Sequence, residues 1–570
     1  MTHDANGERA RALRGIDAAA WAIRHVVQRY AIVGGEGAAR LAVAFAHAEG
    51  VAERIPGDGI DAARAALGEA AAGRRVAIVV SGDALAACVP VLREFVRAAV
   101  PAVLVVPSHG AETGATLPSS SLDDVAHLAE LPVGLLVAGD PAQVADMILA
   151  ATRASVDRRA PWAVAFDLAN VGLVLSPARL PTEEQVRAWT ATLDAQSTGQ
   201  GTPAPVVTAA HDDLARHQRD VERFGFAVNA AMRDLERTLR RPVSPLMAAG
   251  VSDADVILVA TGPSGASARA AIASLHAKSG RHVGAVQIGE MRPLPTAEIV
   301  RLTWRARAVL VHEPWPSPLG SGGRLSDAVR AAFADALTWH PAYTGIGRIP
   351  PVVTVLGDSL DAAAWLSAVE QAMTPADPPR VIVPHVRAGG PGSPVLRIHL
   401  AVHEAERASA LQIVVEWMAR EGASVTAHSV EPDRTELVVP IAPDGRAPPV
   451  SDVMLVCPSG RYEPSRIETL PKGTLVVLVG EFSDRVLAET MRAASARGVR
   501  VAHLHPELPD ERPDALATVA LAAVVRAWVL PETASEGSLD AACRDSGVER
   551  ASVWTAAVSA AGAALRAQGG

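Results

Sequence analysis

Few side chains in this sequence are spaced so that they could assemble a reactive group. The three cysteines, Cys88, Cys457 and Cys543, are each isolated along the chain. An iron–sulfur cluster normally takes four thiolates from closely spaced motifs. We therefore interpret the cysteines as ordinary thiols, and expect any cluster that serves this protein to lie on another polypeptide.

Two short histidine motifs could take part in metal binding or acid–base chemistry. His503 and His505 lie two residues apart on a predicted strand, so both would face one side and could share a metal ion. The sequence offers no third ligand, and we favour surface histidines over a metal site. His312 and Glu313 end a predicted buried strand, where they could contact a cofactor or an interface.

Two glycine-rich segments follow predicted strands and open predicted helices. The segment 30–40 begins like the phosphate-binding pattern G-x-G-x-x-G with Gly35 and Gly37, but an arginine replaces the third glycine. A dinucleotide site and a plain tight turn both remain open here. The segment 260–267 lacks the lysine of a P-loop and one glycine of a nucleophile elbow around Ser264, which favours a structural turn.

Composition and charge exclude several classes of protein. The length of 570 residues predicts about two to four domains. The 53 basic and 62 acidic residues are mixed along the chain, without the basic stripe of a nucleic-acid-binding protein. The longest apolar runs are far shorter than the ~20 residues that span a bilayer. The polar N-terminal segment lacks the apolar core of a secretion signal, so we predict a cytoplasmic protein with no nucleic-acid or membrane partner.

Predicted strands and helices alternate along the chain and indicate an α/β protein. Short apolar runs, such as 76–80, 102–106 and 256–260, are typical of strands in a parallel sheet that is covered on both faces. Ala-rich segments between most of them predict helical crossovers. An amphipathic helix is predicted over 211–241. Its buried stripe would consist of Val221, Phe224, Val228, Met232 and Leu235.

Polar and proline-rich stretches divide the chain into three different modules. We place the first domain at 1–195, followed by a linker and the amphipathic helix at 196–250. The second domain covers 251–376 and the third covers 377–570. We find no short repeat that would indicate a solenoid.

The second domain carries the most specific resemblance to a known family. Residues 253–295 combine a strand, a Gly-Ser turn, a helix, a G-x-x-V-G segment, a second strand and an R-P-x-P segment. Residues 309–333 continue with a strand, an acidic residue and a Gly-rich loop before a helix. This order resembles the transketolase C-terminal-like domain of the 2-oxoacid (pyruvate):ferredoxin/flavodoxin oxidoreductases.

The flanking domains resemble other parts of the same family. Residues 15–23, 66–106 and 163–167 are similar to elements of its transketolase pyrimidine-binding-like domain. The third domain is similar to the family's gamma-type α/β domain, with Asp452 as the aspartate of a P-I-x-x-P-x-V-x-x-A-D segment. The resemblance covers about 15–545 and implies an alpha-type subunit fused to a gamma-type domain.

The resemblance implies a reaction that this chain performs only in a complex. That reaction is the coenzyme A-dependent oxidative decarboxylation of a 2-oxoacid, or its reverse. The implied cofactor is thiamine diphosphate with Mg²⁺, shared with or held by a separate beta-type subunit. Coenzyme A would be a substrate, iron–sulfur clusters would lie only in partner chains, and a ferredoxin-like protein would accept the electrons from this hetero-oligomer.

The positions at which the family binds thiamine diphosphate and substrate are altered in this chain. Tyr30, Val33 and Gly34 lie where the family has a Y-P-I-T-P loop. Gly59 takes the place of a glutamate that bonds the aminopyrimidine, and His109 that of an arginine that binds the substrate carboxylate. The resemblance makes these five residues the candidate cofactor-binding positions. It assigns no catalytic or metal-binding residue.

These departures leave alternative functions open. Asp58 and Asp61 flank the altered position 59, but their shorter side chains would need a backbone rearrangement to replace the glutamate. Residues 403–406 also replace a Gly-Gly-x-Gly turn of the gamma-type domain. One alternative is a catalytically degenerate scaffold or regulatory subunit, a pseudoenzyme that binds no catalytic thiamine. Another is a free-standing binding protein for a small acidic metabolite.

Overall fold

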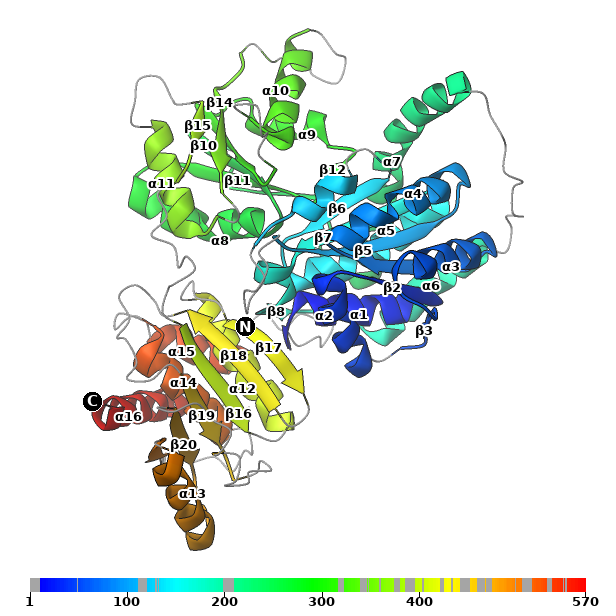
Figure 1. Cartoon of the computed structure of the whole chain (residues 1–570). Helices are drawn as coiled ribbons and strands as arrows, with labels where there is room; N and C mark the ends of the chain where they lie inside the picture. Colours follow the sequence, from blue (N-terminus) through cyan, green and yellow to red (C-terminus); the bar gives the residue numbers. More distant parts are fainter. Residues whose placement is uncertain are drawn as a thin grey trace. The chain divides into compact units, whose positions relative to one another are not determined.

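The computed structural model shows an α/β protein with three separate sheets (Figure 1), which confirms the predicted fold class. The structure describes residues 11–48, 50–110, 120–128, 131, 133–197, 210–315, 322–338, 346, 348–357, 360–373, 380–384, 395–401, 404–420, 425–431, 434–440, 452–458, 467, 474–497, 499–504, 515–530, 536–546, 548 and 551–569.

The chain forms two compact units. One unit comprises residues 15–172 and 180–386 and contains a seven-stranded and a six-stranded sheet. The other contains residues 11–14, 173–179 and the described part of 387–570, which form an eight-stranded sheet. The domain boundaries predicted from the sequence remain predictions.

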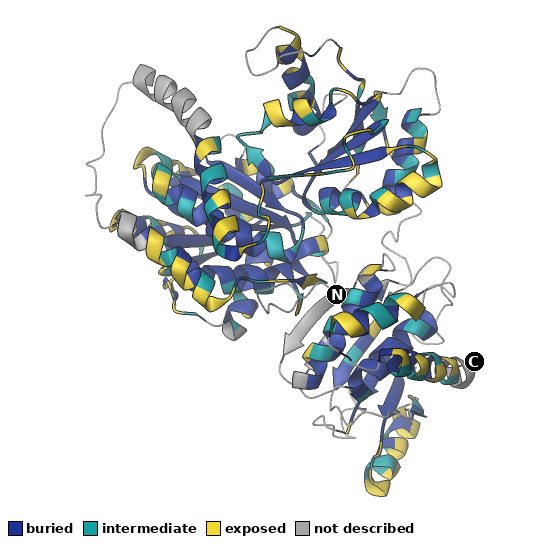
Figure 2. Cartoon of the chain, turned by 180° about the vertical axis from the view of Figure 1, so that it is seen from behind, coloured by how far each residue is buried: buried dark blue, intermediate teal, exposed yellow. Residues whose placement is uncertain are grey.

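The seven-stranded sheet has the order β12-β6-β7-β5-β4-β2-β3. Its strands are parallel except for β12, which pairs antiparallel with β6. The strands are β2 (Arg29–Gly34), β3 (Glu53–Arg54), β4 (Val76–Val80), β5 (Ala102–Ser108), β6 (Gly134–Ala138), β7 (Pro161–Asp167) and β12 (Glu290–Arg292). Every residue of β4, β5, β6 and β7 is buried, as the dark strands in Figure 2 show, because helices cover both faces.

The helices around this sheet come from the same part of the chain. They are α1 (Gly15–Val26), α2 (Glu36–His47), α3 (Gly59–Ala71), α4 (Asp83–Arg97), the 3₁₀ helix η1 (Asp123–Leu128), α5 (Pro141–Arg158), the π-helical turn η2 (Leu168–Gly172), α6 (Glu183–Ser197) and α7 (Ala210–Leu239). Helix α7 is the predicted amphipathic helix. Phe224, Val228, Met232 and Leu235 of the expected stripe are buried, while the side chain of Val221 lies outside the described residues.

The six-stranded sheet has the order β15-β14-β13-β10-β11-β9, and all its pairs are parallel except β11 with β9. Its strands are β9 (Leu246–Ala249), β10 (Val256–Thr261), β11 (Val283–Ile288), β13 (Ala308–Glu313), β14 (Val352–Leu356) and β15 (Val381–Ile382). Its helices are α8 (Gly262–Ser279), α9 (Thr296–Thr303), α10 (Arg324–Leu337) and α11 (Ala362–Met373). Apolar clusters fill both faces of this sheet.

The eight-stranded sheet has the order β1-β8-β17-β18-β16-β19-β20-β21. Its strands are β1 (Arg11–Leu13), β8 (Val174–Ala178), β16 (Val395–Ala401), β17 (Val425–Glu431), β18 (Arg434–Pro440), β19 (Asp452–Val456), β20 (Leu475–Val479) and β21 (Arg500–Leu504). Its helices are α12 (Glu404–Arg420), α13 (Asp484–Arg497), α14 (Ala515–Trp528), α15 (Glu536–Asp545) and α16 (Ala551–Gly569). Sequence patterns did not predict that β1 and β8 join a sheet built mainly from residues after 394.

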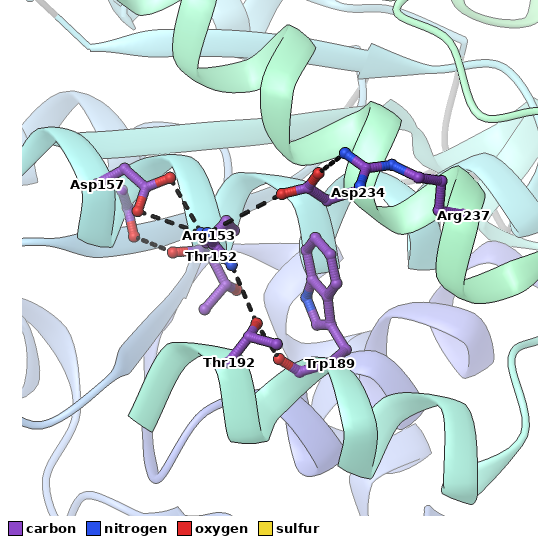
Figure 3. A network of polar contacts seen from close by, with 8 residues as sticks. Thr152, Arg153, Asp157, Trp189, Thr192, Asp234 and Arg237 are labelled. Carbon is purple, nitrogen blue, oxygen red and sulfur yellow. Dashed lines mark hydrogen bonds and ion pairs between the residues drawn. The ribbon is translucent and has the colours of Figure 1, made fainter. Parts of the chain in front are cut away.

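A polar network joins three helices on one face of the seven-stranded sheet (Figure 3). The guanidinium of Arg153 on α5 donates to Asp157, at 3.0 Å from Oδ2, and to Thr192 Oγ1 on α6 at 3.0 Å. It also lies 4.0 Å from Asp234 Oδ2 on α7 and 5.9 Å from the centre of the Trp189 ring. One part-buried cation therefore holds α6 and α7 against α5.

We expect Arg153→Met to destabilise the packing of α6 and α7 on α5 by about 1–3 kcal/mol, because the network loses the cation that contacts all three helices. Amide hydrogen exchange of the two helices measures this change. The matched control is Arg187→Met on α6, whose side chain is 77% exposed in its pair with Glu183. The control should change stability by less than about 0.5 kcal/mol, and equal effects of both variants would contradict the account.

Candidate functional site

The carboxyl ends of four strands meet along one edge of the seven-stranded sheet. Strands β2, β4, β5 and β7 are parallel, so all four end on the same side. Ligands of open α/β sheets bind in the crevices outside this side of the sheet. We call it the carboxyl edge, and it comprises residues 34–37, 81–82, 108–110 and Asp167.

The glycine-rich turn after β2 packs backbone against backbone at this edge. A Cβ on Gly35 would lie 2.1 Å from the carbonyl oxygen of Ser81, and one on Gly37 would lie 2.2 Å from that of Pro107. The Ser81 hydroxyl also accepts a hydrogen bond of 3.2 Å from the N–H of Ala38, in the first turn of α2. This close packing is enough to account for both glycines, which form a tight turn between neighbouring strand ends.

Two of the predicted cofactor-binding residues lie inside a strand rather than in a loop. Tyr30 is buried in β2, and its ring stacks on Phe45 with the ring centres 4.2 Å apart. Val33 belongs to the apolar core on the opposite face of the sheet. Gly34, by contrast, is the last residue of β2 and lies at the carboxyl edge. Their predicted role in cofactor binding remains a prediction.

Gly59 begins α3 with a φ of +55°, and a Cβ there would meet no heavy atom within 4 Å. The carboxylate of Asp61 is 88% exposed and pairs with Arg64 at 3.2 Å. Asp58 precedes the helix, is exposed, and makes no capping hydrogen bond with its side chain. Neither flanking carboxylate is therefore held in a buried position that would substitute for the family's glutamate.

His109 lies at the carboxyl edge directly after β5. Its Nδ1 is 2.9 Å from the carbonyl oxygen of Gly110, so Nδ1 carries the proton of the neutral ring. Its Nε2 is buried and has no hydrogen-bond partner among the residues that the structure describes. A Cβ on Gly82, after β4, would lie 3.7 Å from this Nε2. The structure thus brings His109 next to the end of β4, while Gly59 follows the outer strand β3 in the chain and begins α3.

Asp124 on η1 completes the surroundings of His109. The backbone N–H groups of Gly82 and His109 donate to its carboxylate. Burial raises the pKa of Asp124, and these two N–H groups and the charges of His109 and His127 partly oppose that rise. Its Oδ2 is buried, with no hydrogen-bond partner in the described part of the chain. The sequence analysis missed Asp124, and its one signal was the acidic pair 123–124 in a polar segment after a predicted strand.

Asp167 ends β7 beside Ser108 of β5. It accepts hydrogen bonds from the Ser120 hydroxyl at 2.5 Å and from the N–H of Asn170 at 2.7 Å. Burial raises its pKa to about 6, against the opposing effect of these donors. Because its two oxygens are used by neighbouring backbone and hydroxyl groups, Asp167 fixes the turn after β7.

The motif His312-Glu313 has structural contacts. The buried Glu313 carboxylate accepts from the N–H of Trp315 at 3.1 Å and from those of Leu325 and Ser326, at 3.0 and 2.9 Å, in the first turn of α10. His312 Nε2 donates to the carbonyl oxygen of Gly357 at 2.7 Å, and burial lowers its pKa to about 4. Both residues thus fix the chain at the end of β13.

The remaining motifs also have structural partners. The buried Ser264 hydroxyl accepts from the N–H of Leu360 at 2.9 Å, in line with a structural turn. His503 Nε2 lies 2.8 Å from the carbonyl oxygen of Gly480, while His505 lies outside the described residues. All three cysteines are buried, and burial raises the pKa of Cys457 to about 12.

Residues that follow Asp124 on η1 line a small, open pocket of about 130 Å³ within the same unit. Most of its lining is apolar, with two arginines, and Arg292 donates to the carbonyl oxygen of Leu128 at 3.0 Å. The lining residues are Val125, Ala126, Leu135, Met291, Arg292, Leu294, Trp315, Arg324, Leu325 and Ala328.

One part of the chain matches a known protein family. Residues 254–349 match the family model of the pyruvate:ferredoxin oxidoreductase core domain II. This match supports the 2-oxoacid:ferredoxin oxidoreductase family. It agrees with the resemblance predicted from residues 253–295, and covers β10 to α10 of the six-stranded sheet. No curated protein matches the chain.

Two solved structures are similar to the chain at low identity. One is the 2-oxoglutarate:ferredoxin oxidoreductase from Magnetococcus marinus with 2-oxoglutarate, coenzyme A and succinyl-CoA bound, at 18% identity and a TM-score of 0.46. That alignment covers 64% of this chain and 65% of the other, slightly less than two thirds of its length. The other is a split-gene transketolase, an inactive β4 tetramer, at 15% identity and a TM-score of 0.36, covering 60% of this chain and 88% of that one. Among the described residues no helix is long and apolar enough to cross a membrane.

We expect Gly35→Ala to destabilise the seven-stranded sheet by about 2–4 kcal/mol, because its φ is +94° and the added Cβ would collide with the Ser81 carbonyl. Amide hydrogen exchange in β2 and β4 measures the loss. Gly73→Ala is the control, because Gly73 has a φ of +86° but a Cβ there would meet no atom. This variant should lose only about 1 kcal/mol, the cost of the backbone conformation alone. If the two variants lose the same stability, backbone contact at the edge is not the constraint.

Glu290 on β12 gives a pH-dependent prediction. The residue is 1% exposed, its Oε1 has no partner among the described residues, and burial raises the pKa of its carboxyl group from 4.5 to about 8. The protonated carboxyl group therefore contributes its full stabilisation below pH 4.5. This contribution is lost as the pH rises through 8.

Between pH 5 and 8 the wild-type stability should therefore fall by up to about 1.4 kcal/mol per pH unit more steeply than that of Glu290→Gln. Chemical denaturation across this range measures the two slopes. Glu298→Gln removes a half-exposed carboxylate from α9 and should follow the wild type. Parallel slopes for wild type and Glu290→Gln would refute a titrating buried Glu290.

Proposed function

We propose that this chain is the alpha-type subunit, fused to a gamma-type domain, of a 2-oxoacid:ferredoxin oxidoreductase complex. The complex would catalyse the coenzyme A-dependent oxidative decarboxylation of a 2-oxoacid, or the reverse. The single observation that carries the proposal is the match of residues 254–349 to core domain II of the pyruvate:ferredoxin enzymes. A separate beta-type subunit and a ferredoxin-like acceptor complete the system.

Contacts between the matched domain and the seven-stranded sheet support one functional unit. Strand β12 follows β11 in the chain but pairs with β6 of the other sheet, with Glu290 opposite Leu136. Trp315, after β13, donates from Nε1 to the carbonyl oxygen of Leu122 at 2.7 Å. The family-matched domain therefore holds η1, and with it Asp124, against the carboxyl edge.

The residues of this chain do not fit a complete thiamine site. Thiamine catalysis needs a carboxylate against the pyrimidine ring, because protonation of the ring generates the base that activates the cofactor. Gly59 offers no carboxylate, and Asp58 and Asp61 are exposed beside it. We therefore assign the diphosphate, the Mg²⁺ and the clusters to the beta-type partner, and derive no catalytic step through the cofactor from this chain.

A catalytically degenerate subunit is the second candidate, and the geometry at Gly59 favours it specifically. The space around its Cβ position is open, so nothing in the described surroundings replaces the lost glutamate there. Under this hypothesis the chain keeps the fold and the contacts of an alpha-type subunit and serves as a scaffold or regulator. The two candidates differ in whether the complex contains thiamine diphosphate.

Purification of the complex from its native host distinguishes the two candidates. We expect the chain to co-purify with a beta-type subunit, with about one thiamine diphosphate and bound iron per pair of subunits. The complex should reduce a viologen dye when a 2-oxoacid and coenzyme A are both present. The control is the same purification from a strain that lacks this chain, which should lose 2-oxoacid-dependent dye reduction.

Each possible result favours a different candidate function. A stable complex with neither thiamine nor iron would refute the enzymatic role and support the degenerate subunit. A chain that purifies alone from the native host would contradict both candidates and leave the free-standing binding protein.

A further inference from the structure

The pocket lined by η1, β6, β12 and the start of α10 has the size of one apolar ring. Its volume of about 130 Å³ is close to the roughly 150 Å³ of an apolar cavity that takes up benzene. Apart from Arg292 and Arg324, the described lining residues are aliphatic side chains, one methionine and one tryptophan. Small-molecule sites in proteins combine an apolar lining with a few polar groups in this way.

Hydrogen bonds hold the walls of the pocket in place without a ligand. Trp315 is 8% exposed, and its Nε1 donates to the carbonyl oxygen of Leu122 at 2.7 Å. Arg292 donates from Nη1 to the carbonyl oxygen of Leu128 at 3.0 Å and also to that of Leu131. Because these bonds fix both the indole ring and the guanidinium, a ligand would spend little free energy on ordering the walls.

The charge along the lining favours an anion. Arg324 is exposed and begins α10, and Ala328 follows it four residues later on the same face of the helix, so the guanidinium lies at the mouth of the pocket. The described lining contains no acidic side chain. The acidic groups close by have their own partners, since Glu313 accepts from N–H groups in the first turn of α10 and Asp327 pairs with Arg330 at 2.8 Å.

We propose that this pocket binds a small aromatic monocarboxylate, whose ring enters the apolar part and whose carboxylate pairs with Arg324 at the mouth. A guanidinium matches a carboxylate through two parallel hydrogen bonds. An aromatic ring suits the lining better than a flexible chain, because it interacts favourably with the indole of Trp315 and the thioether of Met291.

This site is separate from the predicted cofactor-binding positions and goes beyond the proposed function. None of the residues that line the pocket is among those five positions. Two of them, Val125 and Ala126, directly follow Asp124 on η1. A bound acid would restrain η1 from this side, so the position is that of an effector rather than that of a substrate.

Fluorine NMR of the full chain titrated with para-fluorophenylacetate tests the proposal. Wild type should bind this probe saturably, with a dissociation constant below about 1 mM. The neutral analogue para-fluorophenylacetamide keeps the ring and loses the charge, while acetate keeps the charge and loses the ring. We expect each of them to bind at least about tenfold more weakly, with acetate measured by competition.

Two variants with matched controls locate the binding. Ala328→Phe places a ring in the pocket from a half-buried position and should weaken binding at least about tenfold. Ala331→Phe adds the same ring at an exposed position of α10 outside the pocket and should bind as wild type. Arg324→Met should weaken binding about tenfold through loss of the ion pair. Its control, Arg301→Met, removes a cation that is 65% exposed on α9.

Amide hydrogen exchange gives a second readout that does not depend on enzymatic activity. The probe should slow exchange in η1 and in the first turn of α10, and leave exchange in α14 of the other unit unchanged. The proposal is overturned if binding does not saturate below about 1 mM, if the amide binds as tightly as the acid, or if Ala328→Phe binds as wild type. A chain that ignores the probe, but whose Ala328→Phe variant no longer assembles with a beta-type subunit, would assign the pocket to a protein partner instead.

Discussion

The close backbone approach between the turn after β2 and the ends of β4 and β5 organises the candidate site. Gly35 lies against Ser81 and Gly37 against Pro107, at distances that leave no room for a side chain. This contact sets where β4 and β5 end and therefore where the backbone N–H groups of Gly82 and His109 point. Those two groups hold the Asp124 carboxylate. The polar pair at the edge thus depends on two glycines that carry no chemistry of their own.

Most buried carboxylates near strand ends serve the fold. Glu313 caps α10 and closes the loop after β13, and Asp167 holds the turn after β7. Asp124 Oδ2 and Glu290 Oε1, by contrast, have no hydrogen-bond partner among the described residues. At the ends of β4 and β5, Ser108 Oγ and His109 Nε2 are likewise buried without a partner in the described part of the chain.

The α/β class and the amphipathic helix could be predicted from the sequence, because continuous apolar strands and the spacing of Val228, Met232 and Leu235 are local signals. The match at residues 254–349 confirms the resemblance inferred for the second domain. Other features depend on contacts between distant segments and have no local pattern. The pairing of Val174 with Thr426 joins β8 to the eight-stranded sheet, and that of Glu290 with Leu136 joins β12 to the seven-stranded one. Asp124 was missed for the same reason, since its partners Gly82 and His109 precede it in two other strand-end loops.

The central proposal is that the chain is a subunit of a 2-oxoacid:ferredoxin oxidoreductase complex, with His109 at its substrate-binding position. The most direct test is 2-oxoacid-dependent dye reduction by the native complex carrying His109→Gln, with subunit composition checked in the same preparation. The account predicts at least a tenfold loss of activity at pH 7 with all subunits still present, about 1.4 kcal/mol of lost transition-state stabilisation. An intact complex with unchanged activity would contradict it.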